Sequence, residues 1–202
     1  MKKAILSIVL VAGVAVAANA QSTSFGVKAG TSLTSFTGKG SEGAENKFGF
    51  NGGLIANFGL SDIVSIQPEL LYSMKGAKGT ETISGTKVTY KENLNYIDVP
   101  VLAHINAGGL FFELGPQVGF LVAANESVEA NGQSQSQDVK SQVKTVDFGY
   151  AAGLGYQLAN GPGIGLRYNG GLVDISKGNN NIDYAIHNSA FQLYVTYMFG
   201  GK

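Results

Sequence analysis

The sequence predicts an all-β protein: an eight-stranded antiparallel up-and-down transmembrane β-barrel that follows a cleaved signal peptide. Residue polarity alternates with a period of two along eight segments, and the connections between these segments alternate between short and long. Composition agrees, because 29 of 202 residues are Gly, and each interior Gly costs a helix about 1 kcal/mol. The chain has no Cys and equal numbers of acidic and basic residues, 14 each. This composition excludes disulfide scaffolds, thiol nucleophiles and the basic charge pattern of a nucleic-acid-binding protein.

The amino-terminal segment has the three parts of a secretory signal peptide. Met1-Lys2-Lys3 is basic, residues 4–17 are almost wholly apolar, and Ala18-Asn19-Ala20 is a small-x-small cleavage site. A membrane anchor is the alternative, but the apolar run is shorter than the roughly 20 residues that a spanning helix needs. We therefore expect residues 1–20 to be a signal peptide and residues 21–202 to form an outer-membrane β-barrel domain.

Eight segments of the mature chain alternate apolar and polar residues, as β-strands with one apolar face do. Most are ten or more residues long. This length is close to the roughly 9–11 residues with which a tilted strand crosses a bilayer. We expect strands at residues 25–33, 48–60, 64–75, 96–105, 112–122, 146–158, 164–172 and 191–199.

The connections alternate in length, as in membrane barrels with short periplasmic turns and long outer loops. Short connections are expected at 61–62, 106–109 and 160–163, and long ones at 35–47, 76–91, 125–145 and 176–188. The polar run at residues 133–137 indicates that the third long connection is a solvated loop. Pro68, Pro100 and Pro116 fall inside expected strands, where a proline removes a donor from the hydrogen-bond ladder. We expect a bulge or a locally unpaired position at each.

Alternation alone allows two orientations of the apolar face. In a soluble lipocalin-like barrel this face would line a cavity for an apolar small molecule, whereas in a membrane barrel it faces lipid. We favour the membrane barrel because the apolar set is bulky and almost uncharged, and because the opposite set is rich in Gly, Ala and Ser, as a narrow lumen requires. Aromatic residues near strand ends are typical of interfacial girdles. They are Phe25, Phe48, Phe50, Phe58, Tyr72, Phe112, Tyr150, Tyr156, Tyr197 and Phe199.

Five short motifs, in their order and spacing, carry a resemblance to a known family. They lie at residues 67–72 (QPELLY), 96–102 (YIDVPVL), 113–119 (ELGPQVG), 147–149 with 153–156 (DFG with GLGY) and 167–172 (RYNGGL). With them the chain resembles the porin-like or PorT-like outer-membrane β-barrel family of Bacteroidetes-type bacteria. The resemblance implies an eight-stranded barrel in the outer membrane of a Gram-negative bacterium, exported by its signal peptide, and it implies no reaction.

The chain end is similar to the assembly signal of outer-membrane barrels, in which aromatic residues stand two apart. Tyr197 and Phe199 supply this pattern. The Gly expected five residues before the last aromatic is Tyr194 here, and three residues follow Phe199. The resemblance implies two partners, outer-membrane lipid and the barrel-assembly machinery, and we expect a monomer.

One Arg and four carboxylates share the face expected to line the lumen. Arg167 is the only Arg in the chain, and the carboxylates are Glu69, Glu113, Asp98 and Asp147. A buried charge without a partner is costly, so we expect Arg167 to pair with at least one of them. The network would then plug the lumen, because eight strands leave little free space. A gated ion path or a binding site is the alternative.

Catalytic and metal-binding signals are missing from the sequence. His104 and His187 are the only histidines and lack the spacing of metal ligands. The carboxylates lie on separate strands without an implied substrate cleft, which disfavours a glycosidase. We therefore expect no enzyme activity, no cofactor and no nucleic-acid partner. The function predicted is that of a porin-like outer-membrane barrel with a structural, small-solute or interaction role.

Overall fold

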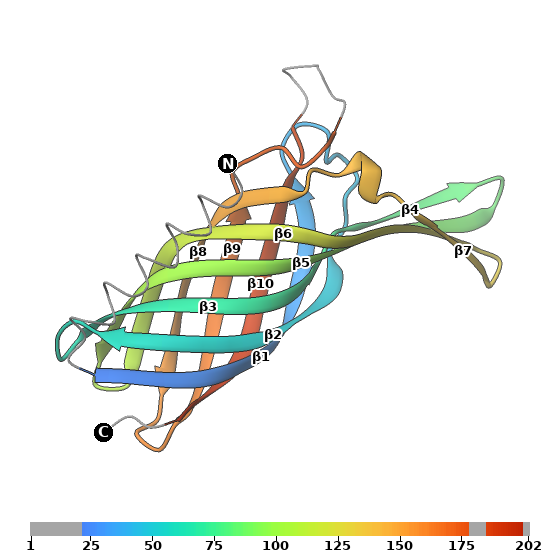
Figure 1. The fold of residues 1–202 in the computed structure, drawn as a ribbon. Coiled ribbons are helices and arrows are strands. Elements are labelled where there is room, and N and C mark those ends of the chain that lie inside the picture. The colour runs from blue at the N-terminus through green and yellow to red at the C-terminus, as the bar shows by residue number, and fades with distance from the viewer. Residues whose placement is uncertain (1–21, 178–184, 200–202) are drawn as a thin grey trace.

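The computed structural model describes residues 22–177 and 185–199, and the expected signal peptide, residues 1–20, lies outside this part. The described residues form ten β-strands and one short 3-10 helix (Figure 1). They are β1 (Ser22–Thr37), β2 (Lys47–Gly59), β3 (Val64–Lys75), β4 (Lys78–Ile83), β5 (Thr86–Ala107), β6 (Leu110–Ala130), β7 (Gln133–Asp138), η1 (Lys140–Gln142), β8 (Val146–Gln157), β9 (Pro162–Gly171) and β10 (His187–Phe199). This part of the chain includes no helix that is long and apolar enough to cross a membrane.

Eight of these strands close into a ring. The sheet order is β4-β5-β3-β2-β1-β10-β9-β8-β6-β7, and an additional β5–β6 pairing closes the barrel. The first and last strands of the ring meet in antiparallel register, with Phe25 opposite Phe199 and Thr37 opposite His187. The prediction of an eight-stranded antiparallel barrel is therefore confirmed. His187, expected in the last long connection, is instead the first residue of β10.

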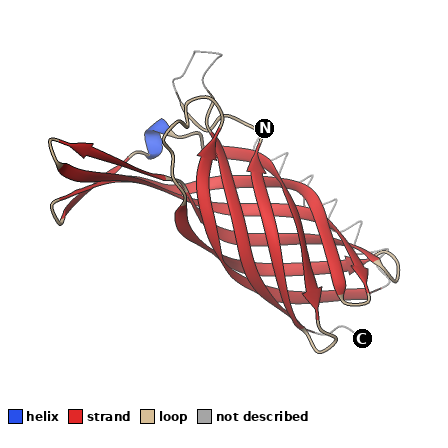
Figure 2. Ribbon diagram, turned by 180° about the vertical axis from the view of Figure 1, so that it is seen from behind, coloured by secondary structure: helices blue, strands red, loops and turns tan. Residues whose placement is uncertain are grey.

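The two expected loops at residues 76–91 and 125–145 are largely strands, which corrects the sequence-based prediction. β5 and β6 are 22 and 21 residues long and continue beyond the ring as one ribbon. β4 pairs with the first part of β5, and β7 pairs with the last part of β6. The result is a four-stranded sheet that projects from one end of the barrel (Figure 2). We call it the projecting sheet.

Two tight turns make these extra strands possible. Ser84 and Gly85 have φ values of 50° and 80°, and Asn131 and Gly132 have values of 50° and 75°. Positive φ at both central residues is what a two-residue type I′ hairpin needs. The Asn-Gly pair is a strong hairpin signal in any sequence, and it outweighs the low complexity of the residues that follow it.

The short connections and both ends of the described chain lie at one end of the barrel. Ser22 pairs with Gly59 next to the connection at residues 60–63, and Gly108–Gly109 joins β5 to β6 at the same end. The projecting sheet and the long connections lie at the opposite end (Figure 1). In outer-membrane barrels the short turns are periplasmic, and this arrangement would place the projecting sheet on the exterior side.

The three prolines are accommodated without a bulge. The strand pairing has the same register before and after each proline. Pairing is interrupted between Pro68 and β2, between Pro100 and β3, and between Pro116 and β5. The register shift between β5 and β6 lies elsewhere, between Asn95 and Tyr96. The barrel therefore accommodates the missing N–H donor of each proline with a locally unpaired position.

The apolar face of the barrel points outward. Leu54, Leu114 and Phe191 are 59%, 61% and 64% exposed, whereas the residues between such positions are mostly polar and buried in the lumen. An outward apolar surface suits lipid, whereas in a lipocalin-like barrel the apolar face of the strands would line the interior. The lipocalin-like alternative therefore does not describe this chain. Nine of the ten expected girdle aromatics are exposed, and Phe58 is half-buried.

Candidate functional site

The lumen has three zones along its length. At the end with the short connections, a cavity of about 1090 Å³ opens outward; we call it the vestibule. Its lining mixes polar and apolar side chains and includes Ser65, Gln67, His104, Glu113 and Tyr194. A layer of buried charges follows, and an apolar cluster closes the opposite end. The vestibule thus ends on the charged layer.

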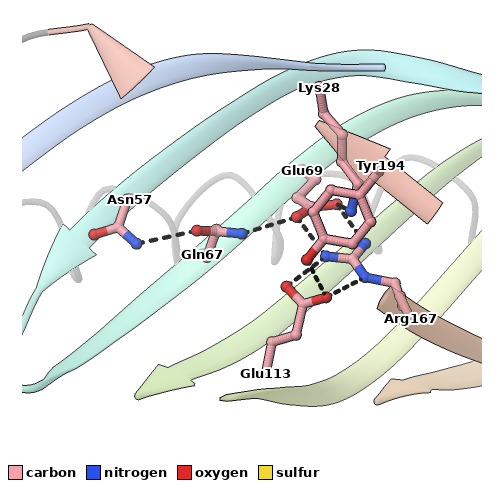
Figure 3. A network of polar contacts seen from close by, with 7 residues as sticks. All are labelled: Lys28, Asn57, Gln67, Glu69, Glu113, Arg167 and Tyr194. Carbon is pink, nitrogen blue, oxygen red and sulfur yellow. Dashed lines mark hydrogen bonds and ion pairs between the residues drawn. The ribbon is translucent and has the colours of Figure 1, made fainter. Parts of the chain in front are cut away.

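Arg167 on β9 bridges two carboxylates across the charged layer (Figure 3). Its Nη1 and Nη2 donate to Glu69 Oε2 and Oε1 at 2.7 and 2.8 Å. Its Nε and Nη2 donate to Glu113 Oε1 and Oε2 at 2.5 and 2.7 Å. Paired bonds of this kind are among the strongest and most directional in proteins. Because Glu69 lies on β3 and Glu113 on β6, the guanidinium ties three separate strands together.

Further groups complete this layer. Tyr194 donates its hydroxyl to Glu113 Oε1 at 2.8 Å, and Lys28 Nζ lies 3.6 Å from Glu69 Oε2 and 3.5 Å from the centroid of the Tyr194 ring. A row of amides leads from the vestibule to the layer, since Asn57 donates to Gln67 at 3.1 Å and Gln67 donates to Glu69 at 2.9 Å (Figure 3). We call Lys28, Glu69, Glu113, Arg167 and Tyr194 the waist cluster. Its two cations balance its two carboxylates.

A glycine makes the contact between Arg167 and Glu113 possible. Gly153 on β8 is the cross-strand neighbour of both residues, so it stands directly between them on the barrel wall. A Cβ at this position would lie 2.6 Å from Glu113 Oε1. Any side chain here would push the carboxylate aside, and this steric role explains a glycine in the middle of a strand.

Asp98 and Asp147, expected among the partners of Arg167, pair with Lys75 instead. Lys75 Nζ lies 3.0 Å from Asp98 Oδ1 and 3.3 Å from Asp147 Oδ2. Asn188 donates to Asp147 Oδ2 at 2.9 Å. Gly119 stands between the two aspartates on the wall, as Gly153 does in the waist cluster. The lumen charges therefore form two clusters rather than one network.

The reason for this division is position along the strands. Lys75 follows Glu69 by six residues on the lumen face of β3, so it lies farther from the vestibule and reaches different partners. Lys28, Lys75 and Tyr194 are members of the lumen clusters that were not predicted from the sequence. Their matching alternation with Glu69 and Arg167 was the available signal.

The exterior end of the lumen is closed by an apolar cluster. Its buried members are Leu94, Tyr96, Leu121, Ala124, Val139, Val143 and Ile175, and Phe36 and Ile186 pack against them. Val139 and Val143 flank η1, and Ile175 follows β9. Phe36, Val139, Val143 and Ile186 lie in segments expected to be loops, so these segments and the ends of barrel strands together form the outer plug of the barrel.

Asp174 holds the two ends of the β9–β10 connection against this cluster. It accepts hydrogen bonds from the backbone N–H groups of Ser176 and Ile186 at 3.2 and 3.0 Å and from Lys144 Nζ at 2.9 Å. Partial burial raises the pKa of Asp174, but these bonds outweigh it and hold the pKa below its ordinary value. The carboxylate form is thus the one that stabilises the closed arrangement.

We expect the outer plug to loosen in acid. A lowered pKa contributes stability above the ordinary Asp value of about 3.9, and this contribution is lost as the pH falls through the lower folded value. The chain has no Trp, so Phe36→Trp would report on the apolar cluster by fluorescence. We expect a red shift of its emission below about pH 4. Asp174→Ala should produce the same shift at pH 7; unchanged emission in both cases would contradict this role.

The remaining predicted residues have structural positions. His104 stacks on Phe111 at 4.7 Å between ring centroids and lines the vestibule. Within residues 22–177 and 185–199, no group of three or more His, Cys, Asp and Glu side chains could hold a metal ion. Tyr197 and Phe199 lie at the end of β10 with exposed rings whose centroids are 5.2 Å apart.

Comparison with known proteins agrees with this architecture. The model of the family described as "Outer membrane protein beta-barrel domain" matches residues 19–177. No curated protein sequence matches significantly. The crystal structure of Neisserial surface protein A is similar over 89% of this chain and 100% of that chain, with a TM-score of 0.51 at 13% identity. At this identity the likeness concerns the fold alone.

Two further solved structures show weaker likeness. Ail of Yersinia pestis, crystallised with the heparin analogue sucrose octasulfate, has a TM-score of 0.46 at 16% identity, over 89% of this chain and 100% of that chain. The outer membrane protein OprG of Pseudomonas aeruginosa has a TM-score of 0.42 at 11% identity, over 91% of this chain and 99% of that chain.

Proposed function

Because the chain belongs to the outer membrane protein β-barrel family, we propose that it is a closed barrel that anchors its projecting sheet at the cell surface. The protein lies in the outer membrane of a Gram-negative bacterium. Its porin-like shape would then serve a structural or interaction role rather than steady ion conduction. Membership of the PorT-like, Bacteroidetes-type branch is part of the proposal, supported by the five motifs of the sequence.

The observation that carries this proposal is the four-bond arrangement of Arg167 across the lumen. Two carboxylates from β3 and β6 meet one guanidinium from β9, and all three side chains are at most 1% exposed. A water path along the lumen would have to separate these ions. The Lys75 cluster and the apolar cluster lie between the waist cluster and the exterior and would each form a further barrier.

Two serines on β3 allow a direct test of closure at the waist. Ser65 and Ser73 both face the lumen, four residues before and four residues after Glu69, and the vestibule is lined by Ser65. The chain has no Cys, so Ser65→Cys and Ser73→Cys each introduce a single thiol. We expect a membrane-impermeant thiol reagent to label Ser65→Cys at least about a hundredfold faster than Ser73→Cys. The reagent can enter the vestibule, but the ion pairs of the waist cluster would block its way to residue 73.

A matched variant and a second measurement complete the test. Adding Glu69→Ala, Glu113→Ala and Arg167→Ala together should speed the labelling of Ser73→Cys while leaving that of Ser65→Cys unchanged. In planar bilayers the wild-type barrel should show no steady conductance. Equal labelling of the two serine positions in the wild type, or a steady conductance, would contradict a closed lumen.

For the chain end, we propose that Tyr197 and Phe199 present the signal read by the barrel-assembly machinery. Both residues are exposed at the end of the last strand, where a partner could reach them. Outer-membrane lipid would then surround the exposed apolar face once the barrel is inserted.

A further inference from the structure

The projecting sheet is a single layer with two outer strands, β4 and β7. A strand at the edge of a sheet presents unpaired N–H and C=O groups, and natural proteins protect such edges with charges, Pro, bulges or covering loops. The two edges of this sheet differ sharply in how far they are protected. The difference indicates which edge is available for pairing.

The β4 edge is protected. Lys78 and Glu81 place charges along it. Lys78 also exchanges backbone hydrogen bonds of 2.7 and 3.2 Å with Glu45 of the β1–β2 connection, and their side chains lie 3.4 Å apart. A loop therefore already lies against the start of this strand.

The β7 edge lacks these devices. Within the described residues β7 pairs with β6 alone, and all six of its residues are exposed. It contains no Pro and no Lys, and its one charge, Asp138, is the last residue of the strand. Such an edge is a template for another strand.

The sequence of β7 indicates which strand could pair with this free edge. Residues 133–137 read Gln-Ser-Gln-Ser-Gln in both directions, so two copies can pair antiparallel about a two-fold axis at Gln135. Gln135 would then face its own equivalent, Ser134 would face Ser136, and Gln133 would face Gln137. Amide and hydroxyl side chains both donate and accept, so each like pair can form hydrogen bonds. No charges oppose each other in this register.

We propose that the free edge of β7 is a homodimer interface, occupied by β7 of a second copy of this chain. The two projecting sheets would join into one continuous eight-stranded sheet. Gln135 is opposite Val128 on β6, so the half-buried apolar strips of the two copies, formed by Val88, Tyr90 and Val128, would lie on the same face of the joined sheet. A homodimer replaces the monomer expected from the sequence, and the interface lies outside the barrel.

An isosteric charge at the centre of the strand tests the interface. We expect sedimentation of the folded wild type in detergent to show a monomer–dimer equilibrium that depends on protein concentration. Gln135→Glu places two carboxylates opposite each other and should raise the dissociation constant at pH 7 by at least about fivefold. Lowering the pH to about 3.5 protonates these carboxylates and should restore the wild-type value measured at that pH.

The β4 edge supplies the matched controls. Thr80→Glu adds the same charge to the other outer strand and should leave the dissociation constant unchanged. In cells, Gln135→Cys should form a disulfide-linked dimer under mild oxidation, and Thr80→Cys should not. A wild type that stays monomeric at all concentrations, equal weakening by both Glu variants, or equal cross-linking at both edges would overturn the proposal.

Discussion

Arg167→Met is expected to destabilise the folded barrel by about 3–5 kcal/mol, because it leaves two buried carboxylates without their partner. Glu69 and Glu113 each accept two hydrogen bonds from the guanidinium, and both are buried. Lys28 reaches Glu69 at 3.6 Å but cannot serve both acids. Reversible urea unfolding in lipid vesicles, followed by the heat-dependent mobility of the barrel on a gel, would measure the change.

A variant without charges in the waist cluster distinguishes the stability lost with the ion partner from the stability lost with side-chain packing. Arg167→Met combined with Lys28→Met, Glu69→Gln and Glu113→Gln removes all four charges of the waist cluster and should recover most of the loss, since neutral replacement of a buried ion cluster is often tolerated. Gly153→Leu should act like Arg167→Met, because a side chain at this position would occupy the space of the Glu113 carboxylate. If the single and quadruple variants were equally unstable, the ion pairs would not be the source of the effect.

Val101→Lys is expected to destabilise the barrel by about 2–4 kcal/mol, the cost of a Lys near the bilayer midplane on the lipid face. Val101 is 38% exposed and lies midway along the part of β5 within the ring. His104→Lys on the same strand is the matched control, because His104 lines the vestibule and is paired with Glu113 across the strands. The same unfolding measurement should give a much smaller loss for His104→Lys.

The comparison of these two variants tests which face of the barrel strands is in contact with lipid. Similar tolerance of Lys at Val101 and His104 would mean that the apolar face does not meet lipid. Gly119 is unsuitable as a lumen control, because a Cβ there would lie 2.6 Å from Asp98 Oδ1 and would disturb the Lys75 cluster.

Much of the barrel followed from the sequence because strand alternation is local. Side chains of successive residues point to opposite faces, so Glu69, Glu113 and Arg167 could be assigned to the lumen without knowing the neighbours of their strands. The signs of their charges then required a pairing inside a narrow space. The bulk and near absence of charge of the apolar set, together with the small residues of the opposite set, predicted the outward face around Val101.

The pairing of each acidic residue with a particular basic residue could be assigned only from the closed ring of strands. Arg167 and Glu69 are far apart in the chain, and their contact depends on the stagger of the strands, which sets the height of each residue along the axis. That stagger sends Asp98 and Asp147 to Lys75 and places Gly153 between Glu113 and Arg167. No local pattern contains this information.

The sequence by itself determined the strand number of the ring, its lipid-facing side and the charges of its interior, because period-two alternation and burial cost act residue by residue. Tertiary structure alone decided the two lumen clusters, the apolar outer plug and the projecting sheet. These depend on pairings between distant segments, which become favourable only when the ring closes and long β5 and β6 support β4 and β7. The polar residues 133–137 show the limit most clearly, since their composition indicates a loop whereas the Asn131-Gly132 turn and the edge of β6 make them a strand.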